Sequence, residues 1–210
     1  MNLDTARTTL LAPYDLESTK LERVFGTLAA HKVDYADLYF QYSRYEGWSL
    51  EEGIVKSGSF NIEQGVGVRA VSGEKTAFAY SDEISFSALQ DAAKATRAIA
   101  AAGQSRRTKV AERKMPVPLY RDVDPIASLD SGLKVKLLEK LEQKCRALDP
   151  RVTQVIASLG GEYEVVLIAR ADGAISADVR PLVRLSVQVI AEANGKRESG
   201  SAGGGGRTDY

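Results

Sequence analysis

This chain of 210 residues has one cysteine, one histidine and no net charge. Its single cysteine, Cys145, cannot form a disulfide within the chain, so nothing points to an oxidising compartment. The 28 Lys and Arg residues balance 28 Asp and Glu residues. Proteins that bind nucleic acid mainly through its phosphates carry a clustered basic excess, and the balanced charge therefore argues against that class.

Long apolar runs are also missing. The N-terminus carries Asp4 early and has no stretch that could serve as a signal peptide or cross a membrane. We therefore expect a cytoplasmic protein with no membrane partner. The densest basic stretch lacks interleaved aromatic residues that could stack on bases, and we interpret it as a solvated linker; it comprises Arg106, Arg107, Lys109, Arg113 and Lys114.

The residues that most often carry catalysis have structural interpretations here. The only histidine, His31, falls at the end of a predicted helix, where it suits the helix dipole. Cys145 lies on an apolar helical stripe, which favours a buried, inert thiol. Catalytic zinc needs about three protein ligands, and the chain has neither H-E-x-x-H nor C-x-x-C. We expect no catalytic, cofactor-binding or metal-binding residue in this chain.

The patterns predict an α+β fold whose first module spans residues 1–103. Helical spacing of apolar residues occurs over 16–32 and again over 89–100. Between them, alternating and aromatic-rich segments predict an antiparallel meander of about four strands, at 35–45, 48–56, 59–71 and 74–80. The two helices should flank this sheet, because covering one face of it is the simplest way to bury the apolar residues.

The segment Gly65-Val-Gly67-Val-Arg-Ala70 formally satisfies the dinucleotide fingerprint G-x-G-x-x-A. That motif needs a helix to begin at its glycines, whereas here a strand pattern continues to a turn at Ser72-Gly73. We therefore predict a strand with Val66, Val68 and Ala70 on one face, hairpin-paired with residues 76–80. The glycines would allow close packing within the sheet.

A proline-containing linker over 104–130 should lead to a second module at 131–210. Residues 131–148 form an amphipathic helix pattern. Three strands of an antiparallel sheet should follow at 152–159, 163–171 and 174–193, with turns at Gly160-Gly161, Asp172-Gly173 and Asn194-Gly195. Pro181 should lie at an edge or bulge and break the last strand. One helix and three strands suggest an incomplete module.

Three regions resemble the N-terminal part of the TldD branch of the TldD/PmbA family: residues 35–41, residues 54–80, and residues 177–186 with 196–198 and 203–207. The resemblance implies a zinc metalloprotease subunit that acts with a PmbA/TldE relative on peptides, including antibiotic precursors and an antitoxin. The family label "modulator of DNA gyrase" does not imply contact with DNA. The family's H-E-x-x-x-H helix and cysteine lie in its C-terminal domain, and neither His31 nor Cys145 corresponds to them.

The resemblance leaves two alternatives. The chain is either the front piece of a longer peptidase or a free-standing module that binds a partner or peptide without hydrolysing it. We favour the first, since the run Gly203-Gly204-Gly205-Gly206 is typical of a flexible hinge, although it would also permit close approach of a peptide backbone. Exposed strands could guide an extended peptide by strand addition, and the candidate residues facing such a substrate are Arg180, Arg184 and Arg207.

Overall fold

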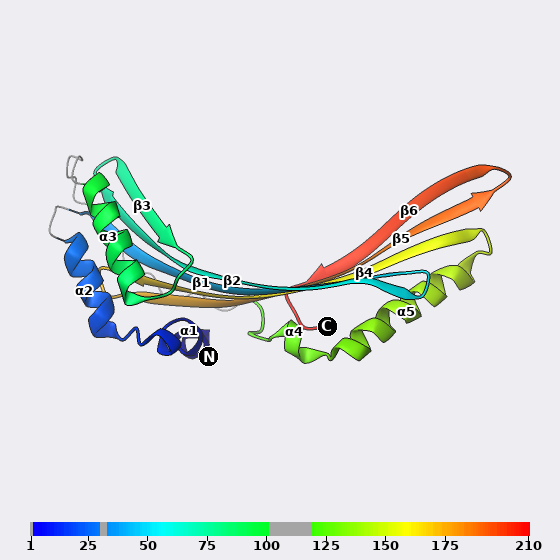
Figure 1. Cartoon of the computed structure of the whole chain (residues 1–210), viewed down its shortest axis with the longest axis horizontal. Coiled ribbons are helices and arrows are strands. Elements are labelled where there is room, and N and C mark those ends of the chain that lie inside the picture. The colour runs from blue at the N-terminus through cyan, green and yellow to red at the C-terminus, as the bar shows by residue number, and fades with distance from the viewer. Residues whose placement is uncertain (1, 30–32, 101–118) are drawn as a thin grey trace. The chain divides into compact units, whose positions relative to one another are not determined.

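The computed structural model describes residues 2–29, 33–100 and 119–210. It confirms the α+β class (Figure 1). The helices are α1 (Asn2–Leu10), the short 3-10 helix η1 (Ala12–Tyr14), α2 (Ser18–Leu28), α3 (Phe86–Ala100), α4 (Pro125–Ser128) and α5 (Ser131–Leu148). The strands are β1 (Tyr35–Glu51), β2 (Ile54–Ser72), β3 (Lys75–Ser81), β4 (Val152–Arg170), β5 (Ile175–Ala193) and β6 (Lys196–Gly206).

The chain divides into two compact units that are each discontinuous in sequence. The first unit comprises Met1–Ser43, Glu63–Pro118 and Glu164–Val179, and the second comprises Arg44–Ile62, Leu119–Tyr163 and Arg180–Tyr210. The strands hydrogen-bond in the order β3-β2-β1-β4-β5-β6. Residues 101–118, which include most of the predicted linker and its basic stretch, lie outside the described part of the chain, as does His31.

The predicted break between two strands at residues 45–48 is wrong. β1 runs without interruption to Glu51, and the chain reverses at Glu52 and Gly53, whose φ angles of 53° and 72° are both left-handed. Two successive positive φ angles make the tight hairpin turn whose twist matches the flanking strands. Glutamate is uncommon at a position with positive φ, so residue 52 carried no turn signal. The predicted strand at 48–56 therefore ran across the turn.

The second module shows a similar difference. Gly160 and Gly161 lie inside β4 and make no turn. The turns at Asp172-Gly173 and Asn194-Gly195 are confirmed, with positive φ at Gly173, Asn194 and Gly195. Pro181 does not break β5, but it lies just beyond Val183, the last residue that pairs with β6, so no ladder hydrogen bond to β6 is lost there.

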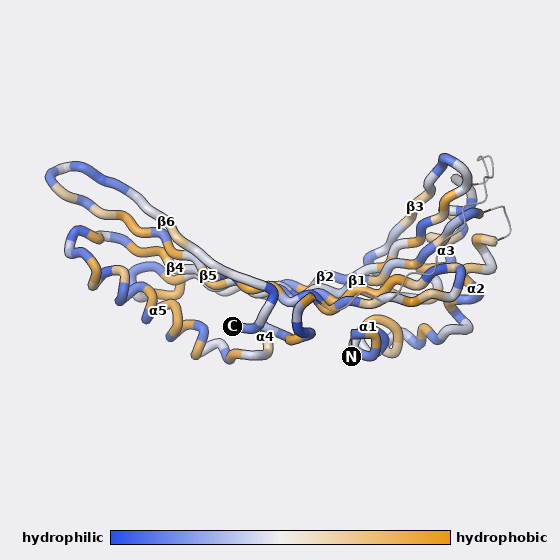
Figure 2. The backbone as a smooth tube through the Cα atoms, turned by 180° about the vertical axis from the view of Figure 1, so that it is seen from behind, coloured by the Kyte–Doolittle hydropathy of each residue, from blue (hydrophilic) through white to orange (hydrophobic). Residues whose placement is uncertain are grey.

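The predicted glycine hinge is also wrong. Residues 203–206 belong to β6, which pairs antiparallel with β5 from Val183↔Gly206 to Ala193↔Lys196. A Cβ atom on Gly205 would lie 2.2 Å from the carbonyl oxygen of Val183, and one on Gly203 would lie 3.0 Å from that of Leu185. Glycine is therefore required by the close approach of two backbones. In the hydropathy view, β6 is blue beside the β5–β6 turn and pale towards its C-terminal end (Figure 2).

The first unit confirms the predicted hairpin. Val66, Val68 and Ala70 are at most 3% exposed, and β2 pairs with β3 from Val66↔Ser81 to Ser72↔Lys75. Helix α3 packs against β3 and α2, and the Thr96 hydroxyl donates to the carbonyl oxygen of Val68 at 3.3 Å. The glycine motif lies in a strand, so the dinucleotide interpretation is excluded.

The second unit is built around α5, whose predicted bounds are confirmed (Figure 1). Asp130 caps its N-terminus by accepting from the amide of Leu133. Leu138 packs with Leu50, Ala157 and Leu159 in a buried cluster. The predicted apolar stripe is only partly right, however. Leu133, Leu137 and Leu148 are substantially exposed, whereas the helix buries Lys134, Leu138 and Glu142 at four-residue spacing.

Candidate functional site

Within the second unit, α5 covers one face of the strands, and a shallow polar groove lies on the opposite face. Its cavity has a volume of about 320 Å³ and crosses β2, β1, β4 and β5. Its lining combines apolar surface, including Trp48 and Leu159, with a set of hydroxyls and one cation: Ser49, Ser57, Ser59, Ser158, Ser186 and Arg184. Hydroxyls can both donate and accept, so this surface suits a backbone-like polar ligand.

The alternation of the strands explains this composition. In β4, Ser158 stands between Ala157 and Leu159, which are buried beneath α5 at 0% and 3% exposure. Side chains of successive strand residues point to opposite faces, so the serine reaches the open face. Its hydroxyl lies 2.8 Å from that of Ser186 on β5. The strand alternation that buries Ala157 and Leu159 therefore also places the Ser158 hydroxyl, together with that of Ser186, on the open face.

Arg184 supplies the groove's positive charge. Its side chain is exposed, and no ion pair joins it to any residue in the described ranges. A Cβ atom on Gly203 would lie 3.5 Å from an Nη atom of Arg184, which places the guanidinium over β6. An unneutralised guanidinium beside several hydroxyls is suited to bind a carboxylate.

The other two predicted arginines are engaged elsewhere. Arg207 donates from Nη1 to the carbonyl oxygen of Pro181 at 3.4 Å, and its guanidinium lies 5.3 Å from the centre of the Tyr120 ring. Arg180 is half-buried and already takes part in an interaction. Of the three candidates, Arg184 alone lines the groove.

A buried ionic cluster lies on the α5 side of the second unit. Nζ of Lys134 is 2.6 Å from Oε1 of Glu46 and donates to the carbonyl oxygen of Ile126 at 2.8 Å. The Tyr210 hydroxyl donates to the same Glu46 oxygen at 2.7 Å, and Trp48 Nε1 donates to the other at 3.3 Å. Burial, followed by the hydrogen bond to Glu46, raises the pKa of Tyr210 well above its usual range. This cluster fixes the end of the described chain against β1.

Sequence reasoning missed this cluster. A signal was present, because Lys134 and Glu142 flank Leu138 at four-residue spacing on the helix. Charged residues on the core face of a helix indicate either a buried pair or a site. Nothing in the sequence pattern identified Glu46 or Tyr210 as partners, since they lie 88 and 76 positions from Lys134 along the chain.

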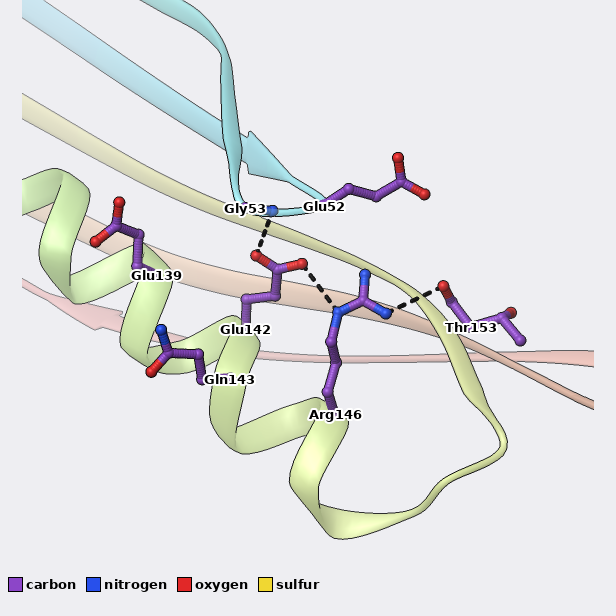
Figure 3. Close-up of a pocket in the computed structure, with 7 residues that line it drawn as sticks. All are labelled: Glu52, Gly53, Glu139, Glu142, Gln143, Arg146 and Thr153. Atoms are coloured by element: carbon purple, nitrogen blue, oxygen red, sulfur yellow. Dashed lines mark hydrogen bonds and ion pairs between the residues drawn. The ribbon is translucent and has the colours of Figure 1, made fainter.

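A larger cleft of about 610 Å³ lies between α5 and the β1–β2 turn (Figure 3). Glu142 dominates it: one carboxylate oxygen accepts from the amide of Gly53 at 2.6 Å, and the other accepts from Nε of Arg146 at 3.1 Å. Arg146 also donates to the carbonyl oxygen of Thr153 at 3.2 Å. These bonds hold the hairpin against the helix, so we assign the cleft a structural role.

Within the described residues, both outer strands of the second unit have free edges. There, β6 pairs only with β5, and β2 pairs with β3 only from Val66 onward, beyond the part of β2 that belongs to this unit. On that part, Ile54, Phe60 and Ile62 are 59%, 54% and 54% exposed. An unpaired strand edge presents backbone donors and acceptors that an extended chain can use.

The described residues do not fit a metal centre. Among residues 2–29, 33–100 and 119–210, no group of three or more His, Cys, Asp or Glu side chains is placed to hold an ion. Cys145 is a free thiol and is only partly buried, less than its apolar stripe predicted. Within the same ranges no helix has both the length and the apolar character needed to cross a membrane.

Comparisons with known proteins agree with this architecture. Residues 36–102 match the PmbA/TldA metallopeptidase domain 1, and residues 124–210 match the PmbA/TldA metallopeptidase central domain. Together these matches cover well over half of the chain and place it in a class of metallopeptidase-family proteins. The chain belongs to the TldD/PmbA family.

Curated relatives support the TldD branch. The chain is 48% identical over 207 residues to a metalloprotease TldD homolog of Haemophilus influenzae, covering 98% of this chain and 43% of that protein. It is 43% identical over 183 residues to a metalloprotease TldD homolog of Buchnera aphidicola from Acyrthosiphon pisum, covering 87% of this chain and 38% of the relative. The chain thus spans less than half the length of these relatives.

Solved structures share the fold. A putative modulator of DNA gyrase from Thermotoga maritima superposes with a TM-score of 0.74 at 16% identity, over 90% of this chain and 43% of that one. TldE from Thermococcus kodakarensis gives a TM-score of 0.70 at 12% identity, over 90% of this chain and 43% of its own. At these identities the similarity establishes the fold alone.

Proposed function

We propose that this chain is the N-terminal part of a TldD-type zinc metalloprotease subunit that acts with a PmbA/TldE-type partner in peptide maturation and antitoxin degradation in the cytoplasm. The match to a first and a central metallopeptidase domain, in that order, supports the assignment. So does the 48% identity to a relative of which the chain spans 43%. In this proposal the zinc ligands belong to a C-terminal domain beyond these residues, and the second module is complete only with that domain.

The role that we propose for this part of the subunit is to hold an extended peptide. The observation that carries it is the open face of the second unit, where Arg184 and a row of serine hydroxyls lie between two free strand edges. A strand added at the β6 edge would pair through its backbone, which gives affinity without dependence on sequence, and the Arg184 guanidinium already lies over β6. Arg184 would bind an acidic side chain or a terminal carboxylate, and Arg180 and Arg207 would flank the same path.

A free-standing module that binds peptide without hydrolysing it is the second candidate. The observation that favours it is that the second unit already has a buried cluster and a braced hairpin formed by its own residues. Both candidates use the same face for binding. They differ in whether hydrolysis follows when the chain is extended.

The deciding experiment compares the 210-residue chain with the same chain joined to a TldD-type C-terminal domain, each with and without a PmbA/TldE-type partner. We expect stoichiometric zinc by mass spectrometry and chelator-sensitive peptide cleavage only in the extended, partnered protein, and a higher unfolding midpoint with less self-association on extension. Zinc-dependent cleavage by the short chain, or an extended assembly that binds peptide but never cleaves it, would contradict the proposal.

A further inference from the structure

The first unit contains a second cavity, of about 350 Å³, on its sheet surface. Its lining combines aromatic rings with carboxylates, in contrast to the hydroxyl groove of the second unit. Tyr39, Phe78 and Tyr80 supply the rings, and Glu63 and Asp82 supply the carboxylates. Phe78 and Tyr80 are 54% and 79% exposed, so much of each ring is open to solvent.

The sequence builds this cavity through its glycines. Gly67 pairs with Tyr80 across the β2–β3 ladder. A Cβ atom on Gly67 would lie 2.8 and 2.9 Å from two atoms of the Phe78 ring, so the ring lies directly on the glycine backbone. The Phe78 and Tyr80 rings are stacked, with centroids 6.2 Å apart and planes 22° apart. The glycine motif thus shapes an aromatic surface.

The charge of the cavity is negative. Glu63 and Asp82 are exposed, and within the described ranges neither forms an ion pair. The polar amides on its wall are already bonded: Gln64 accepts from the Tyr14 hydroxyl at 2.9 Å, and Gln41 donates to Glu164 at 2.7 Å. Arg69, on the neighbouring part of β2, is paired with Asp37. The two free carboxylates therefore lack a cation from the described part of this unit.

We propose that this cavity binds the guanidinium of an arginine side chain on an extended segment of another polypeptide. A cation over an aromatic face is attracted by the ring quadrupole, and a planar guanidinium also stacks on the ring. A carboxylate accepts two parallel N–H bonds from the same group. Arginine fits better than lysine because its charge is delocalised and more weakly hydrated. This cavity shares no residue with the polar groove of the second unit, where Arg184 attracts the opposite charge.

The test is calorimetric titration of the full 210-residue chain with the blocked peptide acetyl-Ser-Arg-Ser-amide. The comparison peptide replaces arginine with citrulline, which keeps the planar shape and removes the charge. We expect arginine to bind at least about tenfold more tightly, with affinity falling as salt is raised. D82N and Y80A should each weaken binding of the arginine peptide by about fivefold or more.

Two matched variants serve as controls. E74Q removes an exposed carboxylate at the β2–β3 turn, and F60A removes an exposed ring in the second unit. Both should bind the arginine peptide like the parent chain, and near-ultraviolet circular dichroism should show that all four variants remain folded. Equal binding of the two peptides, equal losses in control and test variants, or no binding at millimolar peptide would overturn the proposal.

Discussion

Nζ of Lys134 lies 2.6 Å from Oε1 of Glu46, and the two side chains are only 3% and 6% exposed. A buried pair of this kind offsets the cost of removing both charges from water only when each partner has further hydrogen bonds. Here Lys134 also donates to Ile126, and Glu46 accepts from Tyr210 and Trp48. The cluster therefore specifies how α5, β1 and the residues after β6 meet.

Removing one charge of this pair should destabilise the second unit strongly. We expect Lys134→Met to cost about 3–5 kcal/mol, because Glu46 is left buried and uncompensated. Adding Glu46→Gln should restore part of that loss. Urea unfolding of the two variants and the parent measures the effect. Lys136→Met on the exposed side of α5 is the control, and a loss as large as that of Lys134→Met would refute the buried-pair explanation.

Gly161 should tolerate no side chain while Tyr210 is in place. A Cβ atom there would lie 2.1 Å from the Tyr210 hydroxyl oxygen and 2.9 Å from its ring carbon Cζ. We expect Gly161→Ala to cost about 1–3 kcal/mol through overpacking. In a Tyr210→Ala background the same substitution should cost much less. A double-mutant cycle of thermal unfolding measures the coupling between Gly161→Ala and Tyr210→Ala. If the two free-energy changes simply add, the Tyr210 ring does not lie against Gly161.

The Tyr210 phenol should make the stability depend on alkaline pH. Its pKa is raised in the folded chain, so the folded state favours the neutral phenol. Its contribution is fully present below the ordinary tyrosine pKa of 10.0 and is lost as the pH rises above that value. Between about pH 10 and 11, the free energy of unfolding of the parent should fall more steeply than that of Tyr210→Phe. Tyr80→Phe, at a 79% exposed position, should retain the parental slope; identical slopes for all three proteins would contradict the assignment.

Local signals predicted the main helix of this fold and its hairpins other than the one between β1 and β2. Ser72-Gly73, Asp172-Gly173 and Asn194-Gly195 combine turn residues with alternating flanks, and α5 has an aspartate at each end. In these places local propensity and the final structure agree, which is why pattern reasoning succeeds. The pairing of β2 with β3 was predicted in the same way, and so was the buried face of β2.

Features decided by contacts distant in sequence were not predictable. The glycines of β6 looked like a hinge because their role depends on how closely the β5 backbone approaches. The turn at Glu52 is held by Glu142, which lies 89 positions from Gly53. Of the candidate site, sequence reasoning identified Arg184 but not the serine row around it, since the row forms only when four strands align.

We propose that the open face of the second unit holds an extended peptide, with Arg184 binding its carboxylate. The most direct measurement is the affinity of the chain for acetyl-Thr-Val-Glu-Val-Thr-amide by calorimetry. Arg184→Gln should weaken binding about tenfold, and replacing the peptide's glutamate with glutamine should abolish that difference. Arg121→Gln, at an exposed position in the same unit, should bind like the parent. Equal affinities of the parent and Arg184→Gln for the glutamate peptide would contradict the account.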